Sequence, residues 1–328
     1  MYRKTLIDLD DIVIIPSVTS RIETRSEIDI YYHNETKAKN LPLITALLDT
    51  AVSYKNDDFF YKNFINVCYA RGDYYEHYSS THTVSRFRSI SLDEFISIYC
   101  NSHTYLSHEH EICIDTANGH MQKMLDAIYK AKTNYADKIK IMVGNIANPD
   151  TYVKLSMAGA DLVRCSIGSG GACITSEQTA INYPIASLIQ ECYERKADII
   201  SLGGVPSKIV ADGGMKKYAD IIKCLALGAD YVMVGSLFNK AFESTGDTFL
   251  FKKIKINQYS KFAKWLYNHN FTLTKKFRGM STKEVQKKWG NKKLKTSEGA
   301  IRYRPVEYTL DQWVENFEHY LKSCMSYS

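Results

Sequence analysis

The chain has 328 residues, of which 45% are hydrophobic and 24% charged, and a formal net charge of +6. This length exceeds the common domain size, but strand–helix barrels often use about 250 residues or more as one unit, so a single large core is feasible. The composition is that of an ordinary globular protein, and no apolar run approaches the roughly 20 residues that span a bilayer. We expect one domain covering 1–328, located in the cytoplasm and without a membrane partner.

Eight apolar segments bounded by polar turns predict strands along the chain. They lie at 41–47, 64–68, 85–90, 111–115, 139–144, 162–166, 208–211 and 231–235, with helices expected at 120–132, 149–158, 185–194 and 218–226. Strands that alternate with helices are typical of parallel βα units. The sequence therefore predicts an α/β fold, a (β/α)8 or TIM barrel.

Polar residues and glycines follow several of the predicted strands. In such barrels the site lies at the carboxyl ends of the strands, and phosphate is often bound after strands seven and eight. The pairs Gly213-Gly214 and Gly235-Ser236 occupy those two positions, with backbone N–H groups free of bulky side chains. Either pair alone could simply form a βα turn, but the two together favour phosphate. Asp212, just before the first pair, suits a ribose diol because a carboxylate accepts two hydrogen bonds side by side.

A glycine-dense loop at 167–175 ends in Cys173, with Thr175 two residues further on. Small residues let the backbone turn tightly and expose N–H groups, which favour a thiolate over a thiol. A thiolate there is a nucleophile; the alternative is a buried structural cysteine. The eight cysteines and nine histidines show no spacing typical of a zinc site or a disulfide framework, which fits a reducing compartment.

The segment 251–295 carries thirteen Lys and one Arg against a single acid, Glu284. Such a stretch can bind nucleic acid, form a solvated face or collect phosphate-bearing small molecules. We expect no nucleic-acid partner, because neither a recognition fold nor an aromatic stacking motif accompanies the charge.

Motifs in register from about residue 8 to about residue 300 resemble the IMP dehydrogenase/GMP reductase family. Besides the Cys173 loop they are Asp10-Asp11, Arg25-Ser26-Glu27, Asp49-Thr50, Asp115-Thr116-Ala117-Asn118-Gly119, Gly144-Asn145, Asp212-Gly213-Gly214, Gly235-Ser236, Arg278-Gly279-Met280-Ser281 and Ser297-Glu298-Gly299.

The resemblance implies a set of site residues. Cys173 would be the nucleophile, with Thr175 and Glu298 as a proton-transfer pair. Substrate would be bound by Asp212, Gly213, Gly214, Gly235, Ser236, Gly171, Met280, Ser281, Lys295 and Gly299. Asp115, Asn145 and Thr175 would contact the cofactor NADPH, and the backbone carbonyls of Gly168, Gly170 and Cys173 could hold K+. The family also implies a homotetramer.

Two branches of this family share the thiol and the nucleotide site. Only 17 residues separate Met280 from Glu298, Arg302-Tyr303 lies beyond Glu298, and no inserted CBS modules are present. The resemblance thus favours the reductase branch, which converts GMP to IMP and ammonia through a Cys-linked thioimidate. Oxidation of IMP to XMP, a nucleotide-binding barrel without turnover, and a deoxy or modified guanine nucleotide as substrate stay open.

Some segments depart from the family. Gly171 stands where many members carry a serine, and Ser176 and Tyr69 stand where many carry a basic residue. These replacements put the phosphate and cofactor contacts in doubt. We also expect a mobile flap around 277–300 and an insertion around 248–274.

Overall fold

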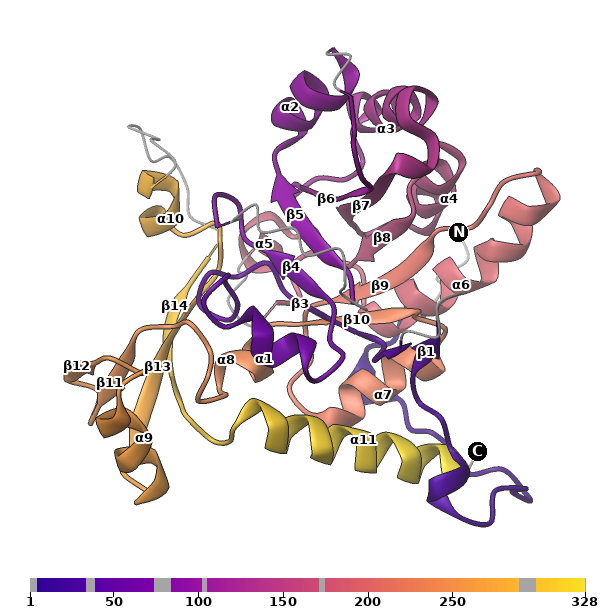
Figure 1. Cartoon of the computed structure of the whole chain (residues 1–328). Helices are drawn as coiled ribbons and strands as arrows, with labels where there is room; N and C mark the ends of the chain where they lie inside the picture. Colours follow the sequence, from indigo (N-terminus) through magenta and orange to yellow (C-terminus); the bar gives the residue numbers. More distant parts are fainter. Residues whose placement is uncertain are drawn as a thin grey trace.

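The computed structural model describes residues 5–33, 39–73, 84–101, 105–170, 175–288 and 299–327. Eight parallel strands form the centre of the molecule, each hydrogen-bonded to the next in chain order (Figure 1). A bridge between Ile44 and Asn66 links the first strand to the second and completes the ring. The strands are β3 (Leu43–Thr45), β4 (Val67–Tyr69), β5 (Arg86–Ile90), β6 (His110–Asp115), β7 (Ile139–Ile146), β8 (Leu162–Cys165), β9 (Lys208–Asp212) and β10 (Tyr231–Val234). The (β/α)8 prediction is confirmed.

Helices follow most of the barrel strands and cover the outside of the ring. The helices are α1 (Asp57–Tyr61), α2 (Leu92–Phe95), α3 (Gln122–Tyr135), α4 (Pro149–Met157), α5 (Thr175–Thr179), α6 (Ile185–Ser201), α7 (Tyr218–Ala226), α8 (Ser236–Asn239), α9 (Lys261–Asn268), α10 (Lys283–Lys288) and α11 (Leu310–Ser326). Helix α7 has the predicted bounds, whereas α6 continues about two turns beyond the predicted end because Ile199 still packs in the core. Among the described residues, no helix is long and apolar enough to cross a membrane.

The barrel strands bury both faces. Val232 and Val234 of β10 point outward to the helices, while Tyr231 and Met233 point into the barrel, as the two-residue period of a strand requires. The inner cluster also contains Phe87, and the outer cluster contains most of the apolar helix residues. Burial on both faces explains why the strands appear as continuous apolar runs in the sequence.

A second, antiparallel sheet lies beside the barrel (Figure 1). Its strand order is β12 (Ile254–Ile256), β11 (Thr248–Leu250), β13 (Leu273–Arg278) and β14 (Ile301–Pro305). The segment expected to be an insertion, 248–274, therefore forms β11, β12, α9 and the start of β13. Arg278 pairs with Ile301, so the two ends of the flap segment are neighbours in this sheet.

Lys275 is a buried link between this sheet and the chain that follows α8. Its side chain is fully buried, and Nζ donates to the carbonyl oxygens of Phe242 and Ser244 at 2.9 and 2.5 Å and to Oε1 of Gln258 at 3.1 Å. Burial lowers the pKa of Lys275 to about 7, although Glu243 opposes the shift. The amino group of Lys275 thus joins the antiparallel sheet to the chain that follows α8.

Candidate active site

A cavity of about 370 Å³ opens at the carboxyl ends of the barrel strands. Twelve of the predicted site residues line it: Asp115, Asn145, Gly168, Gly170, Asp212, Gly213, Gly214, Gly235, Ser236, Met280, Ser281 and Gly299. Thr175 begins α5, and its side chain lies outside what the structure describes. Gly171, Cys173, Lys295 and Glu298 lie outside the described residues. The structure thus brings segments from seven parts of the chain to one place.

Strand alternation explains how three charged side chains reach the cavity. Leu162 of β8 points into the barrel, so Arg164, two residues later, lies on the same inner face. In the same way Asp115 follows Cys113 in β6, and Asp212 follows Val210 in β9. All three residues are at or near the carboxyl ends of their strands, where the barrel interior meets the cavity.

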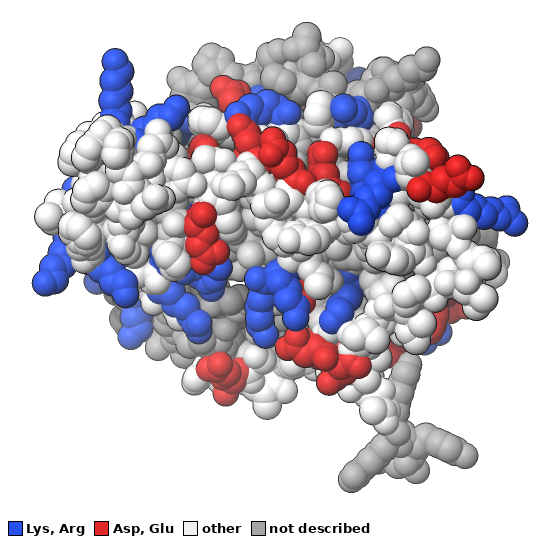
Figure 2. Space-filling model, turned by 90° about the horizontal axis from the view of Figure 1, so that it is seen from below, with Lys and Arg blue, Asp and Glu red and all other residues white. Residues whose placement is uncertain are grey.

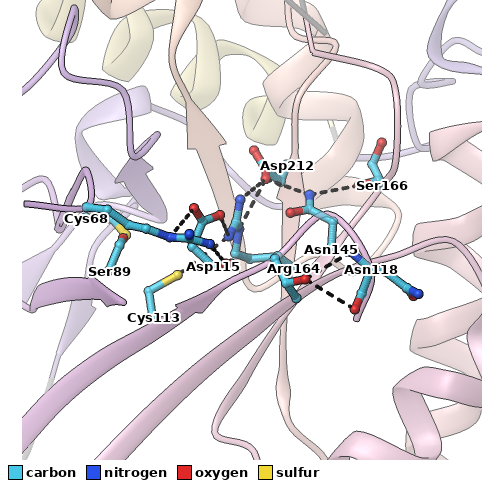
Figure 3. A network of polar contacts seen from close by, with 11 residues as sticks. Cys68, Ser89, Cys113, Asp115, Asn118, Asn145, Arg164, Ser166 and Asp212 are labelled. Atoms are coloured by element: carbon cyan, nitrogen blue, oxygen red, sulfur yellow. Dashed lines mark hydrogen bonds and ion pairs between the residues drawn. The ribbon is translucent and has the colours of Figure 1, made fainter. Parts of the chain in front are cut away.

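Arg164 is the centre of a polar network that crosses the barrel mouth (Figure 3). The residue is only 5% exposed, and its Nη2 lies 2.9 Å from Oδ2 of Asp212. Its Nη1 lies 3.4 Å from Oδ1 of Asp115, and Nε of Arg71 lies 3.1 Å from Oδ2 of the same carboxylate. Two arginines and two aspartates therefore alternate in one chain of ion pairs.

Asn145 extends the network toward the glycine loop. Its Nδ2 donates to Oδ2 of Asp212 and to the carbonyl oxygen of Ser166, both at 2.8 Å (Figure 3). These bonds fix the Asp212 carboxylate from two sides, because Arg164 also donates to Oδ2. The carboxylate is thus held in one orientation before any ligand binds.

The electrostatics of Arg164 are set by its partners. Burial alone would lower the pKa of its guanidinium, but the nearby Asp212, Cys113 and Asp115 outweigh burial and raise the pKa above its ordinary value. Below it lie two buried thiols: Cys113 accepts from Nη1 of Arg164 at 3.6 Å, and Cys68 lies 3.4 Å from Oγ of Ser89. The hydrogen bond with Cys68 is the main cause that lowers the pKa of Cys113, and Arg164 adds to it. Arg164 therefore stays charged.

Gly213 packs directly against the glycine loop that leads toward Cys173. Its φ is +94°, and a Cβ there would lie 2.8 Å from Oγ of Ser169 and 3.0 Å from the backbone nitrogen of Gly170. Ser169 in turn donates to the carbonyl oxygen of Asp212 at 3.3 Å. Only glycine fits this close approach without displacing the loop.

Apolar side chains form the other wall of the cavity. Leu48, Met215, Met233 and Phe277 line it, and a Cβ at Gly235 would lie 2.8 Å from Cδ1 of Leu48. A flat aromatic ligand would thus contact apolar carbon on this side and the charged network on the other.

The beginning of the flap segment is held to the barrel by a buried cation. Arg278 is 4% exposed; its Nη2 lies 2.5 Å from Oδ2 of Asp49, and its Nη1 lies 2.5 Å from Oε1 of Glu284. Lys276 also pairs with Glu284 at 2.7 Å. These contacts place Met280 and Ser281 at the cavity.

A wider cleft of about 720 Å³ adjoins the cavity and shares Arg71 and Met280 with it. Its charged lining consists of Lys55, Arg71 and Lys255 against Asp49, Asp73 and Asp247. The described charges of the cleft are therefore balanced in sign.

The described residues contain no cluster of three or more His, Cys, Asp or Glu side chains that could hold a metal ion. A cation at the glycine loop would depend on backbone carbonyls. The carbonyl of Gly168 already accepts a hydrogen bond from Oγ of Ser176 at 3.2 Å, which still leaves it a lone pair.

Sequence reasoning missed Arg164 and the ion pair of Arg71 with Asp115. For Arg164 a signal existed, because a charged residue inside a run that reads as a buried strand requires a buried partner. For Arg71, two residues after β4, the sequence offers no comparable signal.

The closed parallel strands form a (β/α)8 barrel, and its polar cavity lies at the carboxyl ends of the strands, where enzymes with this fold have their active sites. The protein-family model described as the IMP dehydrogenase / GMP reductase domain matches residues 106–328, so the chain belongs to this family. The family expectation is confirmed.

Both inosine-5'-monophosphate dehydrogenases and GMP reductases are similar to the chain. It is 33% identical to an inosine-5'-monophosphate dehydrogenase of Chlorobaculum tepidum over 218 residues, which is 66% of this chain but 41% of that protein. It is 29% identical to a GMP reductase of Buchnera aphidicola over 338 aligned residues (97% and 88%) and 27% identical to a GMP reductase of Phytophthora infestans (92% and 82%). The chain thus spans less than half of the dehydrogenase and most of each reductase.

Proposed function

We propose that this protein is a GMP reductase, which uses NADPH to convert GMP to IMP and ammonia. One observation carries the proposal: the glycine pairs after β9 and β10, Asp212 and the loop leading to Cys173 line a single cavity. The extent of the similarity supports the reductase branch, because two GMP reductases align with more than 80% of their own length.

In this proposal the nucleotide lies across the barrel mouth. The backbone N–H groups of Gly213, Gly214, Gly235 and Ser236 bind the phosphate, where a barrel presents its strand-seven and strand-eight loops. Asp212 binds the ribose hydroxyls through Oδ1, because Oδ2 already accepts from Arg164 and Asn145. The base lies toward the apolar wall and is contacted from the flap side.

The flap-side contacts are Met280, Ser281 and Gly299, with Lys295 and Gly171 as further substrate contacts. Gly299 lines the cavity and is the neighbour of Glu298 in sequence, which supports a role of Glu298 close to the reacting base.

Cys173 carries the chemistry. Its thiolate adds to C2 of the guanine, the C2–N bond breaks as the nitrogen takes up a proton, and ammonia leaves, so that a covalent thioimidate remains on sulfur. Addition of hydride to C2 and cleavage of the C2–S bond then release IMP and the thiolate. Thr175 and Glu298 supply the proton for the departing nitrogen.

We place the cofactor beside the nucleotide in this proposal. NADPH, when bound, supplies the hydride. Asp115 and Asn145 both line the cavity, and Asp115 pairs with Arg71, where the wider cleft begins, so we assign the cofactor to this direction together with Thr175. The balanced charges of the cleft do not select a 2′-phosphate, so the preference for NADPH over NADH rests on the family and on lysines of the flap. K+ on the carbonyls of Gly168, Gly170 and Cys173 is part of the same proposal.

Oxidation of IMP to XMP is the second candidate. The observation in its favour is the 33% identity to an inosine-5'-monophosphate dehydrogenase. Both reactions use the same thiol and nucleotide site, so the products decide between them.

We further propose a cytoplasmic homotetramer. Support comes from an exposed apolar segment near the start of the chain, in which Val13, Ile15 and Val18 are 80%, 81% and 103% exposed. Light scattering of the full chain at micromolar concentration is expected to give four copies per particle, and a stable monomer would contradict the assembly.

The test of function compares the wild type with Cys173→Ala and with Cys324→Ala as a matched thiol control. The wild type and the control should oxidise NADPH in the presence of GMP and form IMP and ammonia. Cys173→Ala should lose this activity while still binding GMP in calorimetry. More than a few per cent of activity in Cys173→Ala, or XMP formation from IMP without GMP reduction, would overturn the proposal.

A further inference from the structure

A continuous group of exposed aromatic rings covers α9 and the neighbouring turn of the antiparallel sheet. Phe262 and Trp265 are 57% and 49% exposed, and Phe251 and Phe271 are 55% and 39% exposed. Large apolar side chains gathered in this way on a protein surface mark an interaction site.

Helix geometry places part of this group on one stripe. Ala263 and Leu266 form the buried face of α9, and Phe262, Trp265 and the C-cap residue His269 share an exposed stripe beside that face at helical spacing. The rings of Phe262 and Trp265 are nearly parallel, with an interplanar angle of 8°, and His269 stacks on Trp265 at 4.3 Å between centroids.

Phe271 and Phe251 continue the group beyond the helix. The Phe271 centroid lies 5.7 Å from that of Trp265, and Phe251 lies 6.4 Å from Phe271. The aromatic rings thus form one connected surface from the helix to the sheet.

Four exposed lysines alternate with these aromatics: Lys252, Lys253, Lys261 and Lys264. The whole segment 248–274 contains no Asp or Glu, and the described residues provide no acidic partner for these four side chains. On the side of the molecule where α9 lies, Figure 2 shows uncharged atoms bordered by Lys and Arg. We call the five aromatic residues 251, 262, 265, 269 and 271 with these four lysines the aromatic–lysine face.

We propose that the aromatic–lysine face binds single-stranded nucleic acid. Exposed aromatic rings stack on unpaired bases of any sequence, and lysines without acidic partners attract the phosphate backbone. The basic segment was not expected to bind nucleic acid because no stacking aromatics were recognised beside the charge; the fold shows that its aromatics are exposed and grouped.

This site is separate from the proposed active site. None of the residues of the aromatic–lysine face lines the cavity at the barrel mouth or the adjoining cleft. Oligonucleotide binding and GMP turnover can therefore succeed or fail independently.

Fluorescence anisotropy with fluorescein-labelled oligothymidylate and oligouridylate tests the proposal on the full chain. Each lysine–phosphate contact contributes about −0.7 to the slope of log K against log salt, so four contacts predict a slope of about −3. Phe262→Ala/Trp265→Ala should weaken binding at least about fivefold, since each lost base stack costs at least about that factor. Replacing the four lysines by Gln should weaken binding and flatten the slope.

Two variants serve as controls. Tyr129→Ala/Tyr320→Ala removes two exposed rings elsewhere and should change the affinity less than twofold. Trp265→Phe keeps a ring and should retain most of the affinity, which separates loss of stacking from misfolding.

Several results would overturn the proposal. They are no oligonucleotide binding at 50 mM salt, an unchanged affinity or salt slope in the aromatic or lysine variants, and displacement of the oligonucleotide by GMP, which would place it in the cavity. Binding to phosphatidylserine vesicles without oligonucleotide binding would assign the face to a membrane surface instead. A change of oligomeric state in the aromatic variant without oligonucleotide binding would assign it to a second copy of the chain.

Discussion

Replacement of Arg164 by Met tests whether the charge network organises the barrel mouth. The side chain is 5% exposed, and its removal leaves Asp212 and Asp115 with their charges at the end of the barrel interior. Loss of one partner of a buried ion pair typically costs about 3–5 kcal/mol, because the remaining charge is no longer compensated. Asn145 and Arg71 still contact the two carboxylates, so we expect the lower end of this range, about 3 kcal/mol, in the free energy of unfolding.

Urea unfolding at pH 7 measures this loss. Arg88→Met is the matched control, because Arg88 pairs with Glu94 at 3.3 Å at the surface and should cost at most about 1 kcal/mol. The double variant Arg164→Met/Asp212→Asn should regain part of the loss, since it removes one of the two stranded charges. Equal losses in Arg164→Met and Arg88→Met would refute the reasoning.

Three further predictions concern Lys275, Glu298 and the pair Lys292 and Lys293. Burial lowers the pKa of Lys275 to about 7, so between pH 7 and 9 the unfolded chain holds a proton that the folded chain has largely lost, and stability rises with pH by about 2 kcal/mol. Lys275→Met should lack this rise in urea titrations while the exposed Lys253→Met keeps it; parallel pH profiles for the wild type and Lys275→Met would contradict the assignment. Glu298→Gln should slow ammonia loss about 10²- to 10⁴-fold in single-turnover experiments and slow the hydride step less, and an unchanged deamination rate would exclude this proton path. Lys292→Ala/Lys293→Ala should raise the KM for NADPH but barely change that for NADH, whereas equal kcat/KM of the wild type for both cofactors would show that the flap charge serves another purpose.

The barrel could be predicted because its strands are buried on both faces. Each of the eight apolar runs contains an observed strand or most of one, and their ends differ by at most three residues. The antiparallel sheet was not predicted as strands, because its residues carry a different pattern. In β14 all but one residue is exposed, and β13 contains Lys275 and Lys276, so neither resembles an apolar run.

The candidate site could be predicted where it depends on strand ends and glycines. Asp115, Asp212 and the glycine pairs follow apolar runs, and parallel strands bring their carboxyl ends to one rim. The ion pairs among them could not be derived in this way. The pairing of Arg71 with Asp115 joins the turn after β4 to β6, which is not a neighbour of β4, and it depends on side-chain reach rather than on spacing in the sequence.

The alternating ion pairs at the barrel mouth also affect how nucleotide binding responds to ionic strength. Arg71, Asp115, Arg164 and Asp212 are the charged residues among the described residues that line the cavity, and their charges sum to zero. An anion in this cavity therefore meets oriented backbone dipoles and no net positive field from the described side chains, so added salt has little long-range attraction of these side chains to screen. The four lysines of the aromatic–lysine face, in contrast, give that surface of the same molecule a net positive charge. Over the range of salt concentration in which the aromatic–lysine face is expected to release an oligonucleotide, the affinity of the barrel mouth for a nucleotide should thus stay nearly constant.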